Sequence, residues 1–178
     1  LDQTLTLAEL QVIVEEARML NKKTFVHAYG GPGLENAVRA GIDSIEHGAY
    51  LCRSPEAIER MAAQGTYFVP TFMIIARHRE RGSPWARRKA TEMTDDHRRS
   101  LEAAMTAGIP VAMGTDAGGY GHGCNAVELR LLVEAGMTPM QAIMASTSVA
   151  AGCLGMEGQV GALTPGAHAD LLIVAVGK

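Results

Sequence analysis

The sequence MGTDAGG at residues 113–119 follows a short apolar run, Ile-Pro-Val-Ala, at residues 109–112 and ends in two glycines. This pattern predicts a buried strand that delivers one carboxylate, Asp116, into a glycine-rich turn. A lone Asp before Gly is usually a turn residue. Asp116 therefore becomes a candidate for chemistry only if reactive side chains occupy equivalent positions elsewhere in the chain.

Two upstream segments share this arrangement. Residues 24–31, TFVHAYGG, and residues 42–48, IDSIEHG, are β-prone runs that end in a histidine close to glycine. A lone histidine at a strand end is more often a hydrogen-bonded residue than a ligand. In a parallel barrel, however, all C-terminal strand ends open on one face. We therefore expect His27, His47 and Asp116 to converge as a group of metal-capable side chains.

The segments between these strands have helical patterns. Thr6 and Glu9 have the layout of a capping box, and apolar residues follow at helical spacing to position 20. The same reasoning predicts strands at residues 24–27, 42–46, 66–70 and 109–116, with helices between them and two more helices before residue 152. This alternation predicts an α/β fold over residues 1–155.

Residues 73–100 interrupt the alternation with a cluster of basic side chains. Acidic residues lie among and beside them, which favours a solvated helix face or an active-site lid over a phosphate-binding or nucleic-acid-binding surface. We expect His78 and His97, which lie in this insertion, at the surface. His122, in a glycine-rich segment after Asp116, is equally compatible with a substrate contact and with a turn.

Composition narrows the choice of partners. The 178 residues include 16 Lys+Arg and 19 Asp+Glu, and this net charge of -3 gives no general attraction to nucleic acid. No apolar run reaches the roughly 20 residues of a membrane span. Three widely spaced cysteines indicate neither disulfides nor a thiolate metal site, so a cytoplasmic location is expected. The chain begins with Leu1 and is expected to be a fragment.

The last segment, residues 156–178, contains a Pro-Gly turn followed by an apolar run that predicts a strand. Because this strand follows two helices, it is expected to belong to a small separate sheet.

Four segments, taken in order, carry a resemblance to a known family: HAYG at residues 27–30, SIEHG at 44–48, GTD at 114–116 and LTPGAHADL at 163–171. With them, the chain resembles the amidohydrolase superfamily. The nearest branch contains the imidazolonepropionase-related peptidases, including Xaa-Pro dipeptidases and arginine or lysine carboxypeptidases. The resemblance implies a (β/α)8 TIM barrel with one or two divalent metals, usually zinc, and a small β-sandwich built from both chain ends.

The resemblance also implies roles for individual residues. His27 and His47 resemble the metal ligands of the fifth and sixth strands, and Asp116 resembles the aspartate of the eighth. Tyr29 is expected to contact the substrate carboxylate. The family's first-strand His-x-His pair and its fourth-strand bridging lysine have no counterpart in this sequence. We therefore expect residues 1–155 to form the C-terminal part of the barrel, strands 5–8, and residues 156–178 to supply one strand of the sandwich.

The implied function is hydrolysis of a peptide or other amide C–N bond, in substrates such as Xaa-Pro dipeptides or N-acylated amino acids. A metal would activate water, and Asp116 would act as general base and acid. One alternative is cyclic-amide hydrolysis, as in imidazolonepropionase. Another is a catalytically incomplete fragment that forms a homo-oligomer or associates with a missing N-terminal half, because open sheet edges favour pairing.

Overall fold

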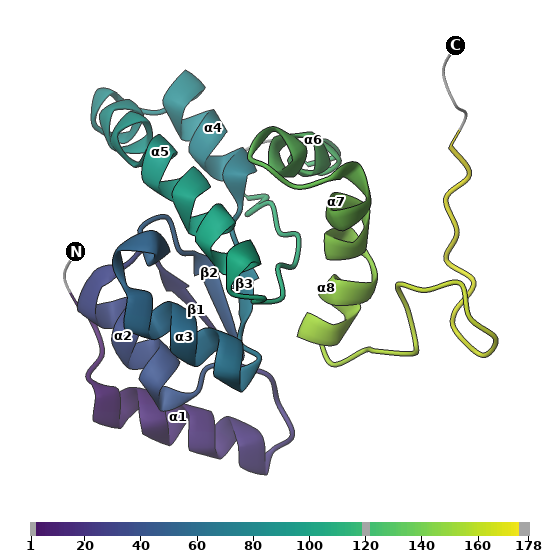
Figure 1. The fold of residues 1–178 in the computed structure, drawn as a ribbon, viewed down its shortest axis with the longest axis horizontal. Helices are drawn as coiled ribbons and strands as arrows, with labels where there is room; N and C mark the ends of the chain where they lie inside the picture. Colours follow the sequence, from purple (N-terminus) through teal and green to yellow (C-terminus); the bar gives the residue numbers. More distant parts are fainter. Residues whose placement is uncertain (1–2, 119–121, 175–178) are drawn as a thin grey trace.

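The computed structural model describes residues 3–118 and 122–174, which are organised around a parallel three-stranded sheet in the order β1-β2-β3 (Figure 1). β1 (Phe25–Ala28) pairs with β2 (Ser44–His47), which pairs with β3 (Tyr67–Val69). The register places His27 beside Glu46. Because the strands are parallel, all three end at the same edge of the sheet.

Helices connect and follow the strands, as the sequence pattern predicts. The capping box of the first helix is formed: the Thr6 hydroxyl accepts the Glu9 N–H, and the Glu9 carboxylate accepts the Thr6 N–H at 2.8 Å. None of the helices in the described ranges is long and apolar enough to cross a lipid bilayer. The helices are α1 (Leu7–Met19), α2 (Gly31–Ala40), α3 (Pro55–Gln64), α4 (Phe72–Arg81), α5 (Pro84–Thr106), α6 (Val127–Glu134), α7 (Pro139–Ser146) and α8 (Ser148–Cys153), with a 3-10 turn at Leu51–Arg53.

The fourth parallel segment is shorter than the strand expected at residues 109–116. Val111 forms a single parallel bridge with Phe68 of β3. Beyond it, the Met113 N–H donates to the carbonyl of Ala145 in α7 at 2.9 Å, so this donor is not available to β3. The segment still runs parallel to β3 at the bridge and leads to Asp116 beyond it.

The main core lies between the sheet and the helices that cover one of its faces. Val26, Ile45 and Phe68 are aligned across the three strands, and Ile45 and Phe68 are fully buried. Leu34 of α2 and Leu101 of α5 belong to the same buried cluster. Burial of these apolar side chains is the main stabilising contribution to the fold, because each is worth roughly 1.5–3 kcal/mol.

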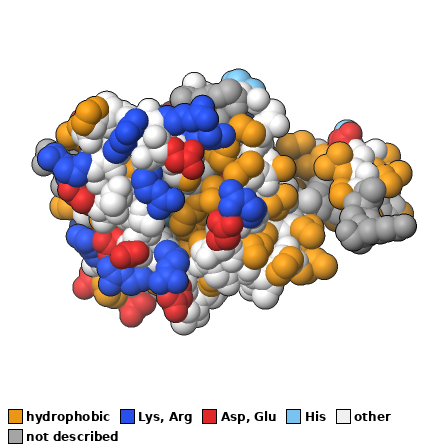
Figure 2. Space-filling view, turned by 90° about the horizontal axis from the view of Figure 1, so that it is seen from above, with side chains coloured by type: hydrophobic (Ala, Val, Ile, Leu, Met, Phe, Trp, Pro, Cys, Tyr) orange, Lys and Arg blue, Asp and Glu red, His pale blue; other side chains and the backbone are white. Residues whose placement is uncertain are grey.

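The insertion at residues 73–100 forms most of the neighbouring helices α4 and α5 (Figure 1). Its basic residues form exposed ion pairs, including Arg88 with Glu92 at 3.7 Å and Lys89 with Glu92 at 3.0 Å. Figure 2 shows Lys and Arg side chains spread over the upper face of the molecule with Asp and Glu among them. This mixture is typical of a solvated helix surface.

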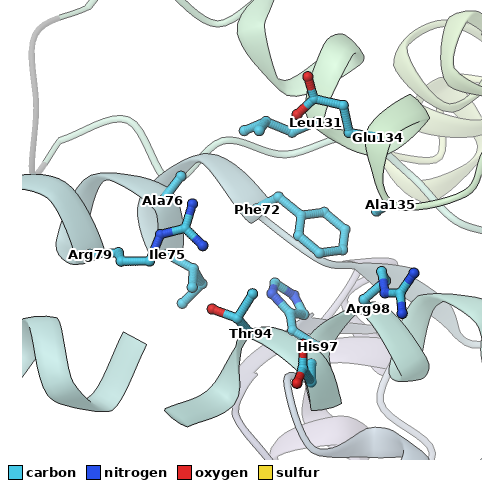
Figure 3. Close-up of a pocket in the computed structure, with 11 residues that line it drawn as sticks. Phe72, Ile75, Ala76, Arg79, Thr94, His97, Arg98, Leu131, Glu134 and Ala135 are labelled. Carbon is cyan, nitrogen blue, oxygen red and sulfur yellow. The ribbon is translucent and has the colours of Figure 1, made fainter. Parts of the chain in front are cut away.

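The surface position expected for His97 is wrong. His97 is 1% exposed, and its ring stacks on that of Phe72 with centroids 4.1 Å apart (Figure 3). The reason is the helical period, since Met93, His97 and Leu101 recur every four residues and form the buried face of α5. Burial lowers the pKa of His97 to about 4, so the ring is neutral. His78, by contrast, is exposed as expected.

The tail leaves the body of the molecule as an extended segment (Figure 1). Up to residue 174, its described part contains no strand, although the sequence predicts one. Leu172 is 94% exposed and Ile173 is 99% exposed. The run is apolar enough for a strand, but a strand also needs a neighbour to pair with its backbone N–H and C=O groups. The assignment of residues 156–178 to a small β-sandwich stays a prediction.

Candidate metal and catalytic site

Two histidines meet at the C-terminal edge of the sheet. His27 is the third residue of β1, and His47 is the last residue of β2. Nδ1 of His27 lies 2.9 Å from Nε2 of His47, and the ring centroids are 4.9 Å apart. His47 is only 4% exposed, whereas His27 is accessible. The predicted approach of these two side chains is therefore present in the structure.

The backbone around His47 is strained. His47 has a φ of 71°, a left-handed conformation that is uncommon for residues other than glycine. This conformation breaks the side-chain alternation of β2 at its last residue. Gly48 follows with a φ of 50°, and a Cβ atom at this position would overlap the ring of Phe68. The glycine after the histidine is therefore required by the turn, and such strain is typical of functional sites.

Thr71 orients the buried histidine. Nδ1 of His47 lies 2.8 Å from Oγ1 of Thr71, and that hydroxyl donates its single proton to the carbonyl of Pro70 at 2.7 Å. The hydroxyl must therefore accept from His47, which places the His47 proton on Nδ1. The lone pair of His47 Nε2 then faces His27. Thr71 itself has a φ of 55°, so a second strained residue supports the pair.

The electrostatic surroundings keep His47 neutral. Burial lowers its pKa, the neighbouring His27 lowers it further, and the negative charge of Asp116 acts in the opposite direction. A histidine must be neutral to offer a lone pair to a metal. The buried ring is therefore in the form that a metal ligand needs.

Asp116 lies close enough to affect several groups at this edge. Burial raises the pKa of Tyr29, and the charge of Asp116 raises it further. Burial also raises the pKa of Glu46, and there the charge of Asp116 is a minor contribution. The Tyr29 ring stacks on His47 with centroids 4.8 Å apart. Asp116 is exposed and has a φ of 53°. His122 is also exposed, and its substrate contact stays a prediction.

The side chains at this edge are of the types that bind divalent metals. Two imidazole nitrogens face each other beside a carboxylate, and imidazole and carboxylate groups are common zinc ligands. In the ranges 3–118 and 122–174, however, no three His, Cys, Asp or Glu side chains lie together as a group that could hold a metal ion. The structure thus brings together two of the three predicted ligands and leaves Asp116 as a neighbour.

Comparison with known proteins identifies the family. The profile of the Amidohydrolase family matches residues 1–177. The chain belongs to this family. Ochratoxinase from Aspergillus niger is 36% identical over 172 residues, which cover 92% of this chain and 35% of the fungal protein. Imidazolonepropionase from Symbiobacterium thermophilum is 31% identical, with coverage of 96% of this chain and 37% of the bacterial protein.

A solved structure with a similar fold is a Xaa-Pro dipeptidase with bound methionine in the active site. It is 34% identical to this amidohydrolase, and the TM-score is 0.83 over 93% of this chain and 42% of the dipeptidase chain. The amidohydrolase therefore has an α/β fold that resembles TIM-barrel members of its family. It spans about two fifths of the length of the relatives that it matches.

Sequence patterns did not identify the residue that supports Thr71. Glu128 of α6 is fully buried, and its two carboxylate oxygens accept the N–H groups of Phe72 at 2.8 Å and Met73 at 2.6 Å. These donors are at the first turn of α4, directly after Thr71. Burial raises the pKa of Glu128 to about 7, against the effect of the two N–H groups. In this amidohydrolase, Glu128 thus fixes the turn that holds Thr71 against His47.

Proposed function

We propose that this amidohydrolase hydrolyses the amide C–N bond of a dipeptide or an N-acylated amino acid, with a divalent metal, most simply zinc, at the histidine pair. The observation that carries the proposal is the approach of His27 Nδ1 and His47 Nε2 to 2.9 Å beside the acidic Asp116. The similarity to an ochratoxinase and to a Xaa-Pro dipeptidase supports hydrolysis as the reaction class.

Each side chain has a defined task in this mechanism. A divalent ion at the pair would lower the pKa of a water molecule and polarise the amide carbonyl. Asp116, whose carboxylate is accessible, takes a proton from the attacking water and gives it to the leaving nitrogen. His27 and His47 would hold the ion through their ring nitrogens, and Thr71 keeps the His47 proton on Nδ1.

Tyr29 fits a role in substrate binding. Burial and the charge of Asp116 raise the pKa of its phenol, so the hydroxyl stays protonated at neutral pH. A protonated phenol can donate a hydrogen bond to a substrate carboxylate. The stacking of the Tyr29 ring on His47, with centroids 4.8 Å apart, supports this role.

Cyclic-amide hydrolysis is the second candidate. It rests on the 31% identity to an imidazolonepropionase over 96% of this chain. The same group of residues could serve a lactam, because ring opening also breaks an amide C–N bond with water and needs the same proton transfers.

The test is a metal determination combined with a substrate panel. Protein expressed from its complete reading frame and purified without chelator should contain near-stoichiometric divalent metal by elemental analysis. It should hydrolyse Xaa-Pro dipeptides or N-acyl amino acids, lose turnover on chelation, and regain it when the ion is restored. Hydrolysis of lactams alone would favour the second candidate. Protein with neither bound metal nor turnover would reject both.

Replacement of Thr71 by Val should weaken metal binding. The variant keeps the shape and β-branching of the side chain but leaves Nδ1 of His47 without its acceptor. Loss of the hydrogen-bond partner of a metal-binding histidine lowers metal affinity about 10- to 100-fold. A competition titration with a chromophoric chelator would measure the dissociation constant. The Thr71→Ser variant, which retains the hydroxyl, is the matched control. Equal affinities in the Val and Ser variants would contradict the orienting role.

A further inference from the structure

A cavity of about 740 Å³ lies beside the histidine pair and opens between the β1 and β2 strand ends and the α4–α5 insertion. Its size is in the range of pockets that bind organic ligands, about 300–1,000 Å³. Tyr29 connects it to the candidate site, because its ring both lines the cavity and stacks on His47 at 4.8 Å. The Tyr50 N–H donates to the Tyr29 carbonyl at 2.7 Å, so the two segments that carry these lining residues are connected.

The wall of the cavity is aromatic and apolar. Tyr29, Tyr50 and Trp85 contribute rings, and Met93 adds a thioether chain. Beneath them, a small buried apolar cluster packs against both tyrosines, so the floor of the cavity is rigid. Trp85 is 65% exposed although it lies on a helix with a buried face. A large apolar ring left open in a cavity is suited to stacking on an aromatic ligand.

The charge of the wall is positive. Arg53 and Lys89 line the cavity, and none of the described residues that line it is acidic. Arg53 lies 4.6 Å above the Tyr50 ring and also pairs with Asp96, which holds the guanidinium in place. Lys89 pairs with Glu92 at 3.0 Å, but both side chains are about half exposed, and such pairs are weak. Lys89 can therefore exchange this partner for a ligand anion.

We propose that this cavity binds the aromatic, negatively charged part of the substrate, so that the amidohydrolase selects amides with a bulky aromatic carboxylate next to the scissile bond. The assignment rests on the proposed amide hydrolysis at the histidine pair. The aromatic rings stack on the ligand ring, and the basic side chains bind its carboxylate.

The fluorescence of Trp85 allows a binding test that does not depend on turnover, because this residue lines the cavity. Protein from the complete reading frame is titrated with 3-phenylpropanoate, with its neutral amide and with butanoate. Loss of the signal in a Trp85→Phe variant assigns it to this residue. We expect saturable binding of 3-phenylpropanoate and at least about tenfold weaker binding of the two other probes, as one lost ionic or stacking contact implies.

The charge is tested with Lys89→Gln, and the exposed Lys22→Gln serves as the matched control away from the cavity. Lys89→Gln should weaken the binding of 3-phenylpropanoate several-fold and leave the binding of the neutral amide unchanged. Lys22→Gln should change the affinity for neither probe. Equal binding of the acid and the amide, or no saturable signal, would overturn the proposal.

A second measurement separates this proposal from the proposed function. 3-Phenylpropanoate should inhibit amide hydrolysis competitively. Binding without inhibition of an active protein would place the cavity outside the substrate site and overturn the assignment. Binding in a protein that hydrolyses no amide would reject the proposed reaction, while the ligand class of the cavity would stand.

Discussion

Replacing Asp116 with Asn should lower turnover by about 10³-fold, because general acid–base catalysis by one side chain contributes roughly 10²–10⁴-fold. Asn has nearly the same shape but cannot accept the proton of the attacking water. It also tolerates the left-handed backbone that Asp116 adopts, with a φ of 53°, so the turn should be preserved. The loss should appear in kcat with little change in KM, as expected for a group that acts in the transition state.

The measurement combines steady-state kinetics with elemental analysis of the same preparation. Asp170→Asn changes another exposed carboxylate, in the tail, and is the matched control. Metal held by the histidine pair should remain in the Asp116 variant. Turnover close to that of the unaltered protein would show that Asp116 is not the proton acceptor, and a different base would have to be sought.

The location of this carboxylate illustrates what the sequence can predict. A β-prone run, a reactive side chain and a glycine recur at His27, His47 and Asp116, and each pattern is local to its own segment. Parallel strands place their C-terminal ends at one edge, so local patterns were enough to predict the approach of His27 and His47, whereas Asp116 lies near this pair without joining it. The capping box at the start of α1, formed by Thr6 and Glu9, could be predicted for the same reason.

Features that depend on partners far away in the sequence could not be predicted from local patterns. Thr71 lies 24 residues from His47, and no local pattern indicates that its hydroxyl fixes the histidine tautomer. Glu128 lies more than 50 residues from the backbone groups that it accepts, and in the sequence it is an ordinary helical glutamate. The burial of His97 depends on which face of α5 packs inward. The strand expected in the tail had the right composition, but no neighbour in the described chain pairs with it.

The largest effect on stability is expected from Glu128→Ala. The substitution leaves the buried N–H groups of Phe72 and Met73 without an acceptor, at a cost of about 1–3 kcal/mol each. Relief from burying a partly ionised carboxyl offsets some of this cost. We expect a net loss of about 3 kcal/mol and a fall in Tm of about 6–12 °C, measured by chemical and thermal unfolding.

The matched control for this prediction is Glu134→Ala. Glu134 is on the same helix, α6, but it is exposed and forms a surface ion pair with Arg130. Its removal should change stability by less than about 1 kcal/mol, because exposed ion pairs contribute little. Similar losses in the two variants would mean that the N–H groups at the start of α4 find other acceptors when Glu128 is absent.

The pH dependence of stability provides a sharper measure of the buried carboxyl. The pKa of Glu128 in the folded protein is about 7, above the ordinary value of 4.5. A raised acid pKa means that the folded state binds the proton more tightly, so this stabilisation is complete below about pH 4.5 and is lost as the pH rises through about 7. Unfolding free energies of metal-free protein and of Glu128→Gln, compared at about pH 5 and about pH 8, should therefore differ in a defined direction. The unfolding free energy of the unaltered protein, relative to that of Glu128→Gln, should fall at the higher pH. If this difference is constant or grows, the two N–H groups hold the carboxylate ionised.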